Sequence, residues 1–466
     1  MSFPLQIPRN LPLRFHLITI ASMTTAPEAS HSVLETRRAL ASGALSPVTL
    51  AESALSRANT NQSRNTYLWR DPEFTLARAR ALAALPPATG GRFGDGREAL
   101  HGIPVSLKDC FDLAGAPTSC GTHFYRDLNG PATANSWLAD QLLAAGAVLT
   151  GKTHLHPLAY GITGENSDFG DCLQPLDPTA LTGGSSSGAA ASVQEGSALA
   201  AISTDTGGSI RVPAALCGLA GYRASITRGQ WHGAAHLAET FDTMGFLFRD
   251  LTDGPLLGSI FGSTNPRAAA LPSRFAIVPD SFLHDCDPSV AAALDRCRSE
   301  LESLGLQPTE VDLDWWADSM EIFAPLQAAQ AARYHRGHYD HFPPDIADRL
   351  RWGASLTDDQ IRALIARWYA FRARMDALLD EHQLLLLPAA PVAKLPAGAD
   401  HSQTRQRLLR YTTPVSLAGM PAVTIPFSHG GMQLVSARED DPRLLALAAN
   451  LGQLRKSSGK STRASW

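Results

Sequence analysis

One sequence pattern most constrains the fold of this chain. A buried strand ends in charged residues, and a helix and a second buried strand follow it. Residues 102–107 read Gly-Ile-Pro-Val-Ser-Leu and run directly into a lysine and an aspartate. Residues 136–145 have the helical period, with Ser136 as N-cap and Gly146 as stop, and 147–150 form a short apolar run. This order is typical of βαβ units and predicts a mostly parallel sheet.

The same alternation extends over most of the chain. Residues 34–40 are amphipathic, and Ser46-Pro47 predicts the start of a helix, with serine as N-cap and proline at the first helical position. A Gly- and Pro-rich stretch at 86–97 predicts a surface loop, and the helical period dominates 288–380. Two further buried strands are expected at 384–388 and 422–426.

The sequence shows no tandem repeat, no long linker and no break in composition. We therefore predict a single α/β domain over 23–455, with a disordered extension at 1–22 and a frayed basic tail at 456–466. Met23 is an alternative start of translation.

Composition excludes several classes of protein. The chain has 466 residues, of which 44% are hydrophobic and 18% charged, and these proportions are typical of a globular protein. The net charge of −4 argues against nucleic-acid binding, and no apolar run reaches the length of a membrane span. The six scattered cysteines have no metal-ligand spacing, and His154 and His156 lack a second ligand pair. We expect a cytoplasmic protein with reduced thiols and no metal.

Two Gly/Ser clusters stand out, at 183–192 and 204–213. A flexible linker is the simplest interpretation of the first cluster. Its context opposes that interpretation, because a small-residue helix and a strand-like run at 199–203 separate it from the second cluster. In the second cluster, successive backbone N–H groups can converge on one point and form an oxyanion hole. The expected donors are Thr206, Gly207, Gly208 and Ser209.

A serine nucleophile needs a base, and no histidine stands in a Gly-x-Ser-x-Gly pattern. A neutral lysine can serve instead. Only five of the 40 basic residues are lysines, and Lys108 ends an apolar strand, where burial depresses the pKa of an amine. Lys152 also follows a strand and is the rival candidate.

The run His101 to Asp109 resembles the lysine-bearing segment of the amidase signature family, and the spacing of 24 positions between Ser185 and Ser209 is similar to that between the family's two catalytic serines. The resemblance is strong over 101–225 and returns at 384–391 and 417–422, whereas 230–380 match weakly. The loop at 427–431 is shorter than the family pattern and lacks its proline, which is a departure at the expected pocket edge.

The resemblance implies an α/β/α sandwich whose large mixed sheet is covered by helices on both faces. It also implies that Ser209 is the nucleophile, that Ser185, held in a cis peptide, is the bridging serine, and that Lys108 is the base. Lys152 becomes a scaffold lysine, and no cofactor is required. Three polar residues are expected to brace the site: Thr204, Asp205 and Arg211.

Substrate preference must come from the weakly matching region, which is rich in large side chains. Most of these belong to the core, but a few facing the cleft would form an apolar, aromatic-lined pocket. We therefore expect small-molecule aryl or alkyl amides, with anilides, esters and carbamates as side activities. The large side chains are Trp231, Phe241, Met244, Phe246, Trp315, Trp316, Phe323, Trp352, Trp368 and Tyr369. Four arginines could include one that binds a substrate carboxylate: Arg349, Arg351, Arg362 and Arg367.

Two alternatives stay open. The first is a glutamine-hydrolysing amidotransferase subunit that shares the signature and works with partner subunits. The second is an inactive homologue used for binding, although such homologues lose catalytic residues and this chain keeps all three. For the hydrolase itself, we expect neither nucleic acid nor membrane as a partner, and a homodimer is the assembly to test.

Overall fold

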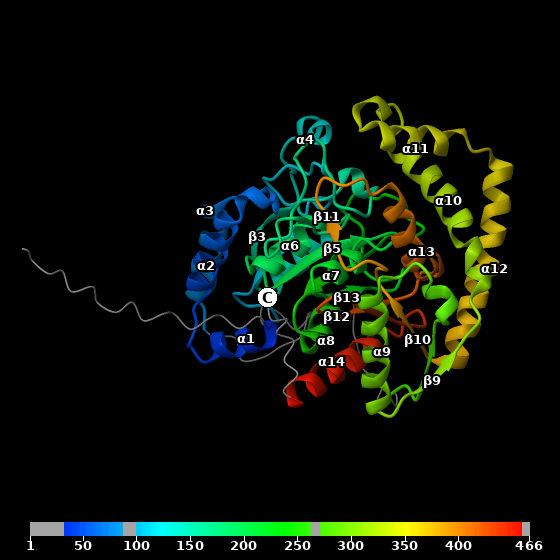
Figure 1. The fold of residues 1–466 in the computed structure, drawn as a ribbon. Coiled ribbons are helices and arrows are strands. Elements are labelled where there is room, and N and C mark those ends of the chain that lie inside the picture. The colour runs from blue at the N-terminus through cyan, green and yellow to red at the C-terminus, as the bar shows by residue number, and fades with distance from the viewer. Residues whose placement is uncertain (1–31, 87–98, 262–270, 459–466) are drawn as a thin grey trace, which may run out of the picture.

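A single large sheet organises the computed structural model, which describes residues 32–86, 99–261 and 271–458 (Figure 1). The sheet has 11 strands with helices on both faces, as the family resemblance implied. In spatial order the strands are β1 (Tyr67–Trp69), β3 (Val148–Thr153), β2 (Pro104–Lys108), β5 (Ala200–Asp205), β7 (Thr243–Phe248), β6 (Ala220–Arg223), β12 (Ala422–Phe427), β13 (Gly430–Ser436), β10 (Leu384–Pro388), β8 (Arg274–Ile277) and β9 (Gln307–Glu310).

The expectation of a mostly parallel sheet is wrong. Parallel pairing is confined to β3–β2–β5 on one side and β10–β8–β9 on the other. Between them, β5, β7, β6, β12, β13 and β10 pair antiparallel. The reversals arise where the chain returns without a crossover helix, as between β6 and β7 and at the β12–β13 turn.

Helix starts follow the predicted capping residues. Helix α1 (Val33–Ala41) covers the amphipathic stretch, and Ser46 caps α2 (Pro47–Thr60) by accepting the Thr49 N–H at 3.1 Å. Ser136 caps α5 (Trp137–Ala144) in the same way. The remaining helices of the sheet layers are α3 (Pro72–Ala83), α4 (His123–Asn129), α6 (Ser187–Glu195), α7 (Arg211–Leu216), α8 (Gly254–Gly258), α9 (Pro288–Ser303) and α14 (Asp441–Ser457).

Helix α6 approaches its surroundings very closely. A Cβ added to Gly188 in its first turn would lie 2.0 Å from the Thr66 carbonyl oxygen and 2.5 Å from the His154 nitrogen. Only glycine fits where backbone meets backbone at this separation. The helix is thereby held against the β2–β3 side of the sheet, and Ser185 lies just before its start.

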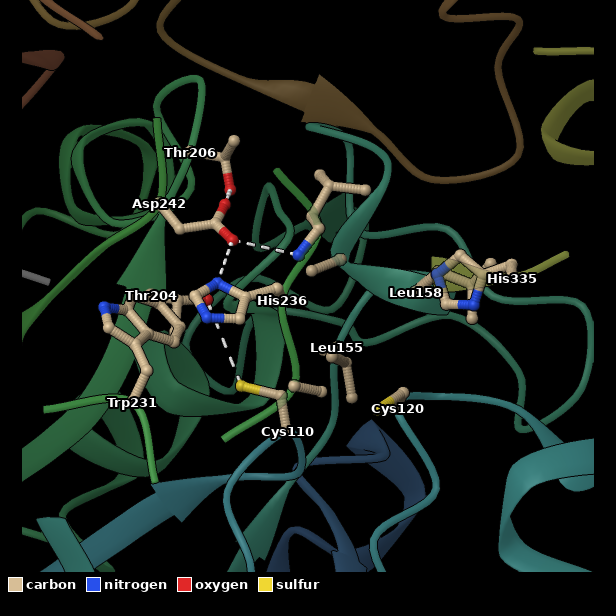
Figure 2. Close-up of a pocket in the computed structure, with 13 residues that line it drawn as sticks. Cys110, Cys120, Leu155, Leu158, Thr204, Thr206, Trp231, His236, Asp242 and His335 are labelled. Atoms are coloured by element: carbon tan, nitrogen blue, oxygen red, sulfur yellow. Dashed lines mark hydrogen bonds and ion pairs between the residues drawn. The ribbon is translucent and has the colours of Figure 1, made fainter. Parts of the chain in front are cut away.

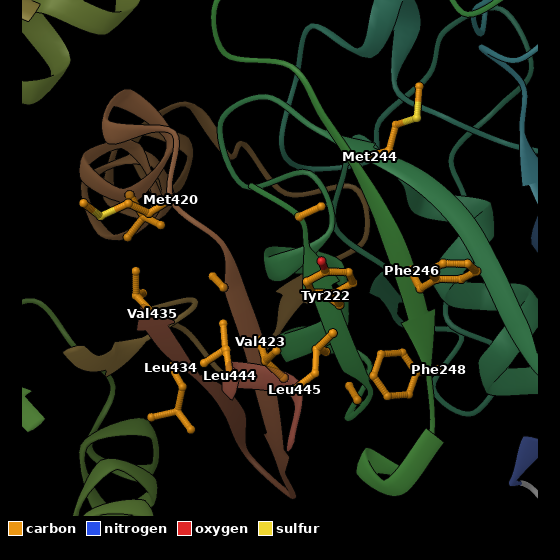
Figure 3. Packing of buried hydrophobic residues seen from close by; sticks show 14 of the residues in the cluster. Tyr222, Met244, Phe246, Phe248, Met420, Val423, Leu434, Val435, Leu444 and Leu445 are labelled. Atoms are coloured by element: carbon orange, nitrogen blue, oxygen red, sulfur yellow. The ribbon is translucent and has the colours of Figure 1, made fainter. Parts of the chain in front are cut away.

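Apolar residues of the central strands form the core. Figure 3 shows Tyr222, Phe246, Phe248, Val423 and Leu445 packed together, and all five are fully buried or nearly so. They come from β6, β7, β12 and α14, elements far apart in the sequence. Burial of this kind is the main favourable contribution to folding and fixes the strands that carry the site.

A helical layer, which runs up one side of the molecule in Figure 1, fills the predicted helical region. It consists of α10 (Ser319–Tyr334), α11 (Pro344–Ser355) and α12 (Asp358–His382), and α13 (Ser402–Ala418) packs against α10 and α12. No helix among the described residues is long and apolar enough to cross a membrane.

Helix α14 runs to Ser457, two residues into the predicted tail. Arg455, the last residue of the predicted domain, is buried, with its guanidinium 2.7 Å from Glu300. The predictions for 1–22, for 459–466 and for nearly all of the loop at 86–97 lie outside the described residues.

Candidate active site

Lys108 is the last residue of β2 and is completely buried. Its Nζ lies within hydrogen-bond distance of three hydroxyls, at 2.9 Å from Ser185 Oγ, 3.1 Å from Ser186 Oγ and 2.9 Å from Thr204 Oγ1. No carboxylate of the described residues is within ion-pair distance of it. Burial therefore lowers the pKa of Lys108, although more distant acidic groups act in the opposite direction. A lysine in this setting can act as a neutral base.

The two serines of the candidate triad lie on the segments that precede α6 and α7. The Gly184–Ser185 peptide is cis, and the Ser185 carbonyl accepts the His156 N–H at 3.1 Å. The next residue, Ser186, donates its N–H to the Ser209 carbonyl at 3.3 Å, which joins the two segments. Ser209 is only 5% exposed, yet it lines a pocket. The structure thus places Lys108 against Ser185 and joins the segment of Ser185 to the segment of Ser209.

Asp205 anchors the segment that carries Ser209. Its carboxylate accepts the backbone N–H of Gly208 (2.8 Å) and Ile210 (3.1 Å). It also pairs with the buried guanidiniums of Arg211 (2.9 Å) and Arg223 (2.8 Å). Burial alone would raise the pKa of Asp205, but the two guanidiniums outweigh it and hold the pKa well below its usual range. This cluster of Asp205, Arg211 and Arg223, the Asp205 clasp, fixes the loop before α7.

One predicted oxyanion-hole donor is already engaged. Because the Gly208 N–H donates to Asp205, it is not free to bind a substrate oxygen. Within the described chain, the N–H groups of Thr206, Gly207 and Ser209 have no such partner. The structure therefore leaves these three as the candidate donors.

The walls around this loop leave no room for larger residues. Gly208 has φ +126°, and a Cβ there would lie 2.7 Å from Thr412 Oγ1. The Thr412 hydroxyl in turn donates to the Gly207 carbonyl at 2.5 Å. A Cβ on Gly207 would lie 3.2 Å from the Phe323 ring. Helices α10 and α13 thus hold the loop from outside.

Lys152 on β3 has a different environment. It is also fully buried, but its Nζ lies 2.6 Å from Asp109 Oδ1 and donates to the Pro117 carbonyl and the Thr118 hydroxyl. This buried ion pair ties β3 to the loop after β2. The arrangement agrees with a scaffold role for Lys152.

A first pocket, the Trp231 pocket, lies beside Thr204 and Thr206 (Figure 2). Its apolar wall includes Trp231, Leu155 and Leu158. The Trp231 ring stacks on His236 at 4.3 Å between centroids. Other lining residues are Cys110, Cys120, Leu237 and Ala235.

The polar wall of the Trp231 pocket is organised by Asp242. Its carboxylate accepts the Thr206 hydroxyl at 2.6 Å and lies 3.0 Å from His236 Nδ1 (Figure 2). It also accepts the backbone N–H groups of Leu237 and Ala238. Asp242 thereby fixes the position of Thr206, an expected oxyanion donor.

A second pocket, the Arg405 pocket, contains the nucleophile candidate. Ser209, Gly207, Tyr160, Gln327, Leu409 and Arg405 are among its lining residues. Ala159 and Thr206 line both pockets, so the two pockets adjoin at the candidate site. Gln327 comes from α10, and Arg405 and Leu409 from α13.

Half of the ten large side chains expected to shape substrate preference are buried in the core, namely Phe241, Met244, Phe246, Trp316 and Phe323. Trp231 lines a pocket, Phe323 contacts Gly207, and Phe241 packs on Phe323 at 4.9 Å. Trp352 and Tyr369 instead face solvent.

Of the four arginines considered as carboxylate binders, only Arg349 approaches a pocket, through its contact with Tyr160. The other three, Arg351, Arg362 and Arg367, pair with acidic residues at the surface.

The expectation that residues 427–431 form an edge of the pocket is wrong. These residues form the β12–β13 turn, and Phe427 contacts Arg296 and Arg455. Neither pocket beside Ser209 is lined by this turn.

Sequence reasoning missed several residues of the site. The missed residues are Ser186, Arg223, Asp242, Thr412 and Arg405. A signal existed only for Ser186, which stands beside Ser185 in the first Gly/Ser cluster.

Solved structures share this architecture. The crystal structure of an amidase superposes with a TM-score of 0.80 at 32% identity, over 91% of this chain and 99% of that one. A bacterial aryl acylamidase of the amidase signature family matches in fold, with a TM-score of 0.77 at 19% identity over 92% of this chain and 97% of its own.

Sequence comparisons agree. A glutamyl-tRNA(Gln) amidotransferase subunit of Chloroflexus aggregans is 30% identical over 87% of this chain and 93% of that protein. The 2-amino-5-chloromuconic acid deaminase of Comamonas testosteroni is 30% identical over 81% of this chain and 87% of that protein. The family model described as Amidase matches residues 49–445. The chain therefore belongs to the amidase signature family, whose members hydrolyse amides.

Proposed function

We propose that this protein is an amidase that hydrolyses a linear carbon–nitrogen amide bond through an acyl-enzyme on Ser209, with Ser185 and Lys108 as proton relay. One observation carries the proposal. The Lys108 amine is buried without a carboxylate and lies 2.9 Å from Ser185 Oγ. A lysine paired with an acid would stay protonated and could not accept a proton.

The reaction proceeds in two halves. Neutral Lys108 takes a proton from Ser185 as Ser185 takes one from Ser209, and Ser209 Oγ bonds to the amide carbon. The C–N bond then breaks while Ser185 returns a proton to the departing nitrogen, which leaves as the amine. Water attacks the acyl-enzyme through the same relay, and the carboxylic acid and free Ser209 result.

Negative charge develops on the carbonyl oxygen in both halves. The N–H groups of Thr206, Gly207 and Ser209 are the donors we assign to it. The Asp205 clasp and the Thr206–Asp242 contact hold these donors in place beforehand, and preorganised donors stabilise a transition state most.

Covalent labelling tests the nucleophile and the inactive-homologue alternative together. A fluorophosphonate should add once to the protein, at Ser209, as read by intact mass and peptide mapping. Ser209→Ala should abolish labelling and reduce amide turnover at least about 10³-fold while leaving the unfolding temperature unchanged. Labelling at another serine, or unchanged turnover, would contradict the assignment.

The apolar wall of the Trp231 pocket supports aryl or alkyl amides as substrates. Anilides, esters and carbamates share the tetrahedral chemistry and should be turned over as side activities. A panel of a para-nitroanilide, an aliphatic amide, an aryl ester and a carbamate tests this. Turnover of glutamine alone would contradict it.

The amidotransferase alternative is supported by the names of relatives such as the Chloroflexus protein. Glutamine carries an ammonium group, which needs an acidic partner when it is buried. Among the described residues, neither Asp nor Glu lines the Arg405 pocket, and Asp242 in the Trp231 pocket is already engaged by Thr206, His236 and two backbone N–H groups, which favours the amidase. Glutaminase activity, or other proteins that co-purify with this chain as a complex, would reverse this preference.

A further inference from the structure

Arg405 differs from the other arginines of α13. It lies in the first turns of the helix and lines the pocket that contains Ser209. Arg407 and Arg410 on the same helix both pair with Asp285. Within the part of the chain that the structure describes, the Arg405 guanidinium has no hydrogen bond and no ion pair.

The surroundings of Arg405 do not supply the missing anion. The Arg349 guanidinium lies 4.3 Å from the Tyr160 ring centroid, in the wall of the same pocket, and pairs with Asp345 at 2.8 Å. Burial, together with repulsion from Arg349, lowers the pKa of Arg405 to about 10, against the weaker opposing effects of Tyr160 and Asp345. A half-buried guanidinium without a counter-ion is costly unless a ligand provides one.

The clasp behind Ser209 adds charge of the same sign. Asp205 is the only acid in the clasp and faces two guanidiniums, those of Arg211 and Arg223. The clasp therefore carries one net positive charge next to Ser209. The Asp242 carboxylate lies on the Trp231 side and is engaged by Thr206, His236 and two backbone N–H groups, so the positive potential is greatest on the Arg405 side.

We propose that Arg405 is a substrate-binding residue that holds a carboxylate of the substrate. This inference rests on the proposed function and narrows its substrate class. The substrate is an amide with an apolar group on the Trp231 side and a carboxylate on the Arg405 side. The guanidinium fork can donate two parallel hydrogen bonds to a carboxylate, and Gln327 offers an amide donor beside it.

Three amides test whether a substrate carboxylate matters and on which part of the substrate it lies. Pentanoyl para-nitroanilide is neutral, glutaryl para-nitroanilide carries a carboxylate on the acyl part, and N-pentanoyl para-aminobenzoate carries it on the amine part. One of the two acids should have a higher kcat/KM than the neutral amide, and which one it is shows which part of the substrate lies beside Arg405.

Arg405→Gln is the decisive variant, and Arg407→Gln is its matched control on the same helix. Arg405→Gln should lower kcat/KM for the preferred acid roughly 30- to 100-fold, mainly through KM, as expected for loss of one charge-assisted contact. The neutral amide should change less than about threefold. Arg407→Gln should leave both substrates unaffected.

Binding without turnover completes the test. Calorimetry on Ser209→Ala should detect the preferred acid, and Ser209→Ala combined with Arg405→Gln should bind it at least about tenfold more weakly. Equal kcat/KM for acids and neutral amide, or equal losses for both in Arg405→Gln, would overturn the proposal. Binding that needs Arg405 but is not followed by turnover in the wild type would support this site and contradict the hydrolase.

Discussion

Lys108 and Lys152 lie on neighbouring strands, are both completely buried, and differ in their partners. Lys152 contacts a carboxylate, Asp109, at 2.6 Å, whereas Lys108 contacts only hydroxyls. An adjacent carboxylate favours the protonated amine, and hydroxyls compensate less for the lost hydration of a charge. The comparison teaches that equal burial can produce a structural cation or a base, depending on one neighbouring oxygen.

The largest effect is expected when Lys108 is replaced. Lys108→Met removes the base and should lower kcat at least about 10³-fold, with the unfolding temperature unchanged or higher, because a thioether replaces a poorly solvated amine. Amide turnover and thermal unfolding check this. Lys394→Met, at a partly exposed lysine, is the control and should be neutral. Residual activity above a few per cent would show that Lys108 is not the base.

Lys152→Met should instead damage stability. The variant leaves the Asp109 carboxylate buried without its partner, which costs about 3–5 kcal/mol of unfolding free energy. Urea denaturation measures the loss, and adding Asp109→Asn should restore part of it. A stable but inactive Lys152→Met protein would transfer the base role to Lys152.

Ser185→Ala and Ser186→Ala test which hydroxyl relays the proton, since both touch Lys108. Ser185→Ala should reduce kcat at least about 100-fold, and Ser186→Ala less than about tenfold, because it removes one supporting hydrogen bond. Equal losses would show that the relay does not distinguish the two serines.

The pH dependence of the rate and of the stability also distinguishes Lys108 from Lys152, and its effect is smaller than those of the substitutions. Because the folded pKa of Lys108 is lowered, the rate should rise with pH through an apparent pKa below 10.5. Between that pKa and 10.5 the unfolded chain binds a proton that the folded one lacks, so stability rises with pH by up to about 1.4 kcal/mol per pH unit. Urea unfolding across this range should show that the difference in unfolding free energy between wild type and Lys108→Met changes with pH in favour of the wild type.

The local motifs explain which parts of the site were predictable. Lys108, Ser185 and Ser209 stand at strand ends or in Gly/Ser clusters, so each of them can be recognised from its neighbours in the sequence. Arg223 and Arg405 are ordinary arginines in their own segments, and only the packing of β6 and α13 brings them to the site.

The sheet illustrates the same limit. The βαβ pattern before residue 205 correctly predicted parallel β3, β2 and β5. Strand direction beyond that point depends on how β6, β7, β12 and β13 return to the sheet. Hydrophobic runs identify strands, but they do not specify the direction in which a strand enters the sheet.

The tight contact at Gly188 has a consequence for the evolution and engineering of this enzyme. Because a methyl group there would meet two backbone segments, the floor of the site tolerates almost no variation. New specificities are expected to arise from the helical wall, where Gln327 and Arg405 line the pocket and are only partly buried. Libraries randomised at these two positions should therefore yield folded proteins with altered substrate ranges far more often than libraries in the glycine-rich floor.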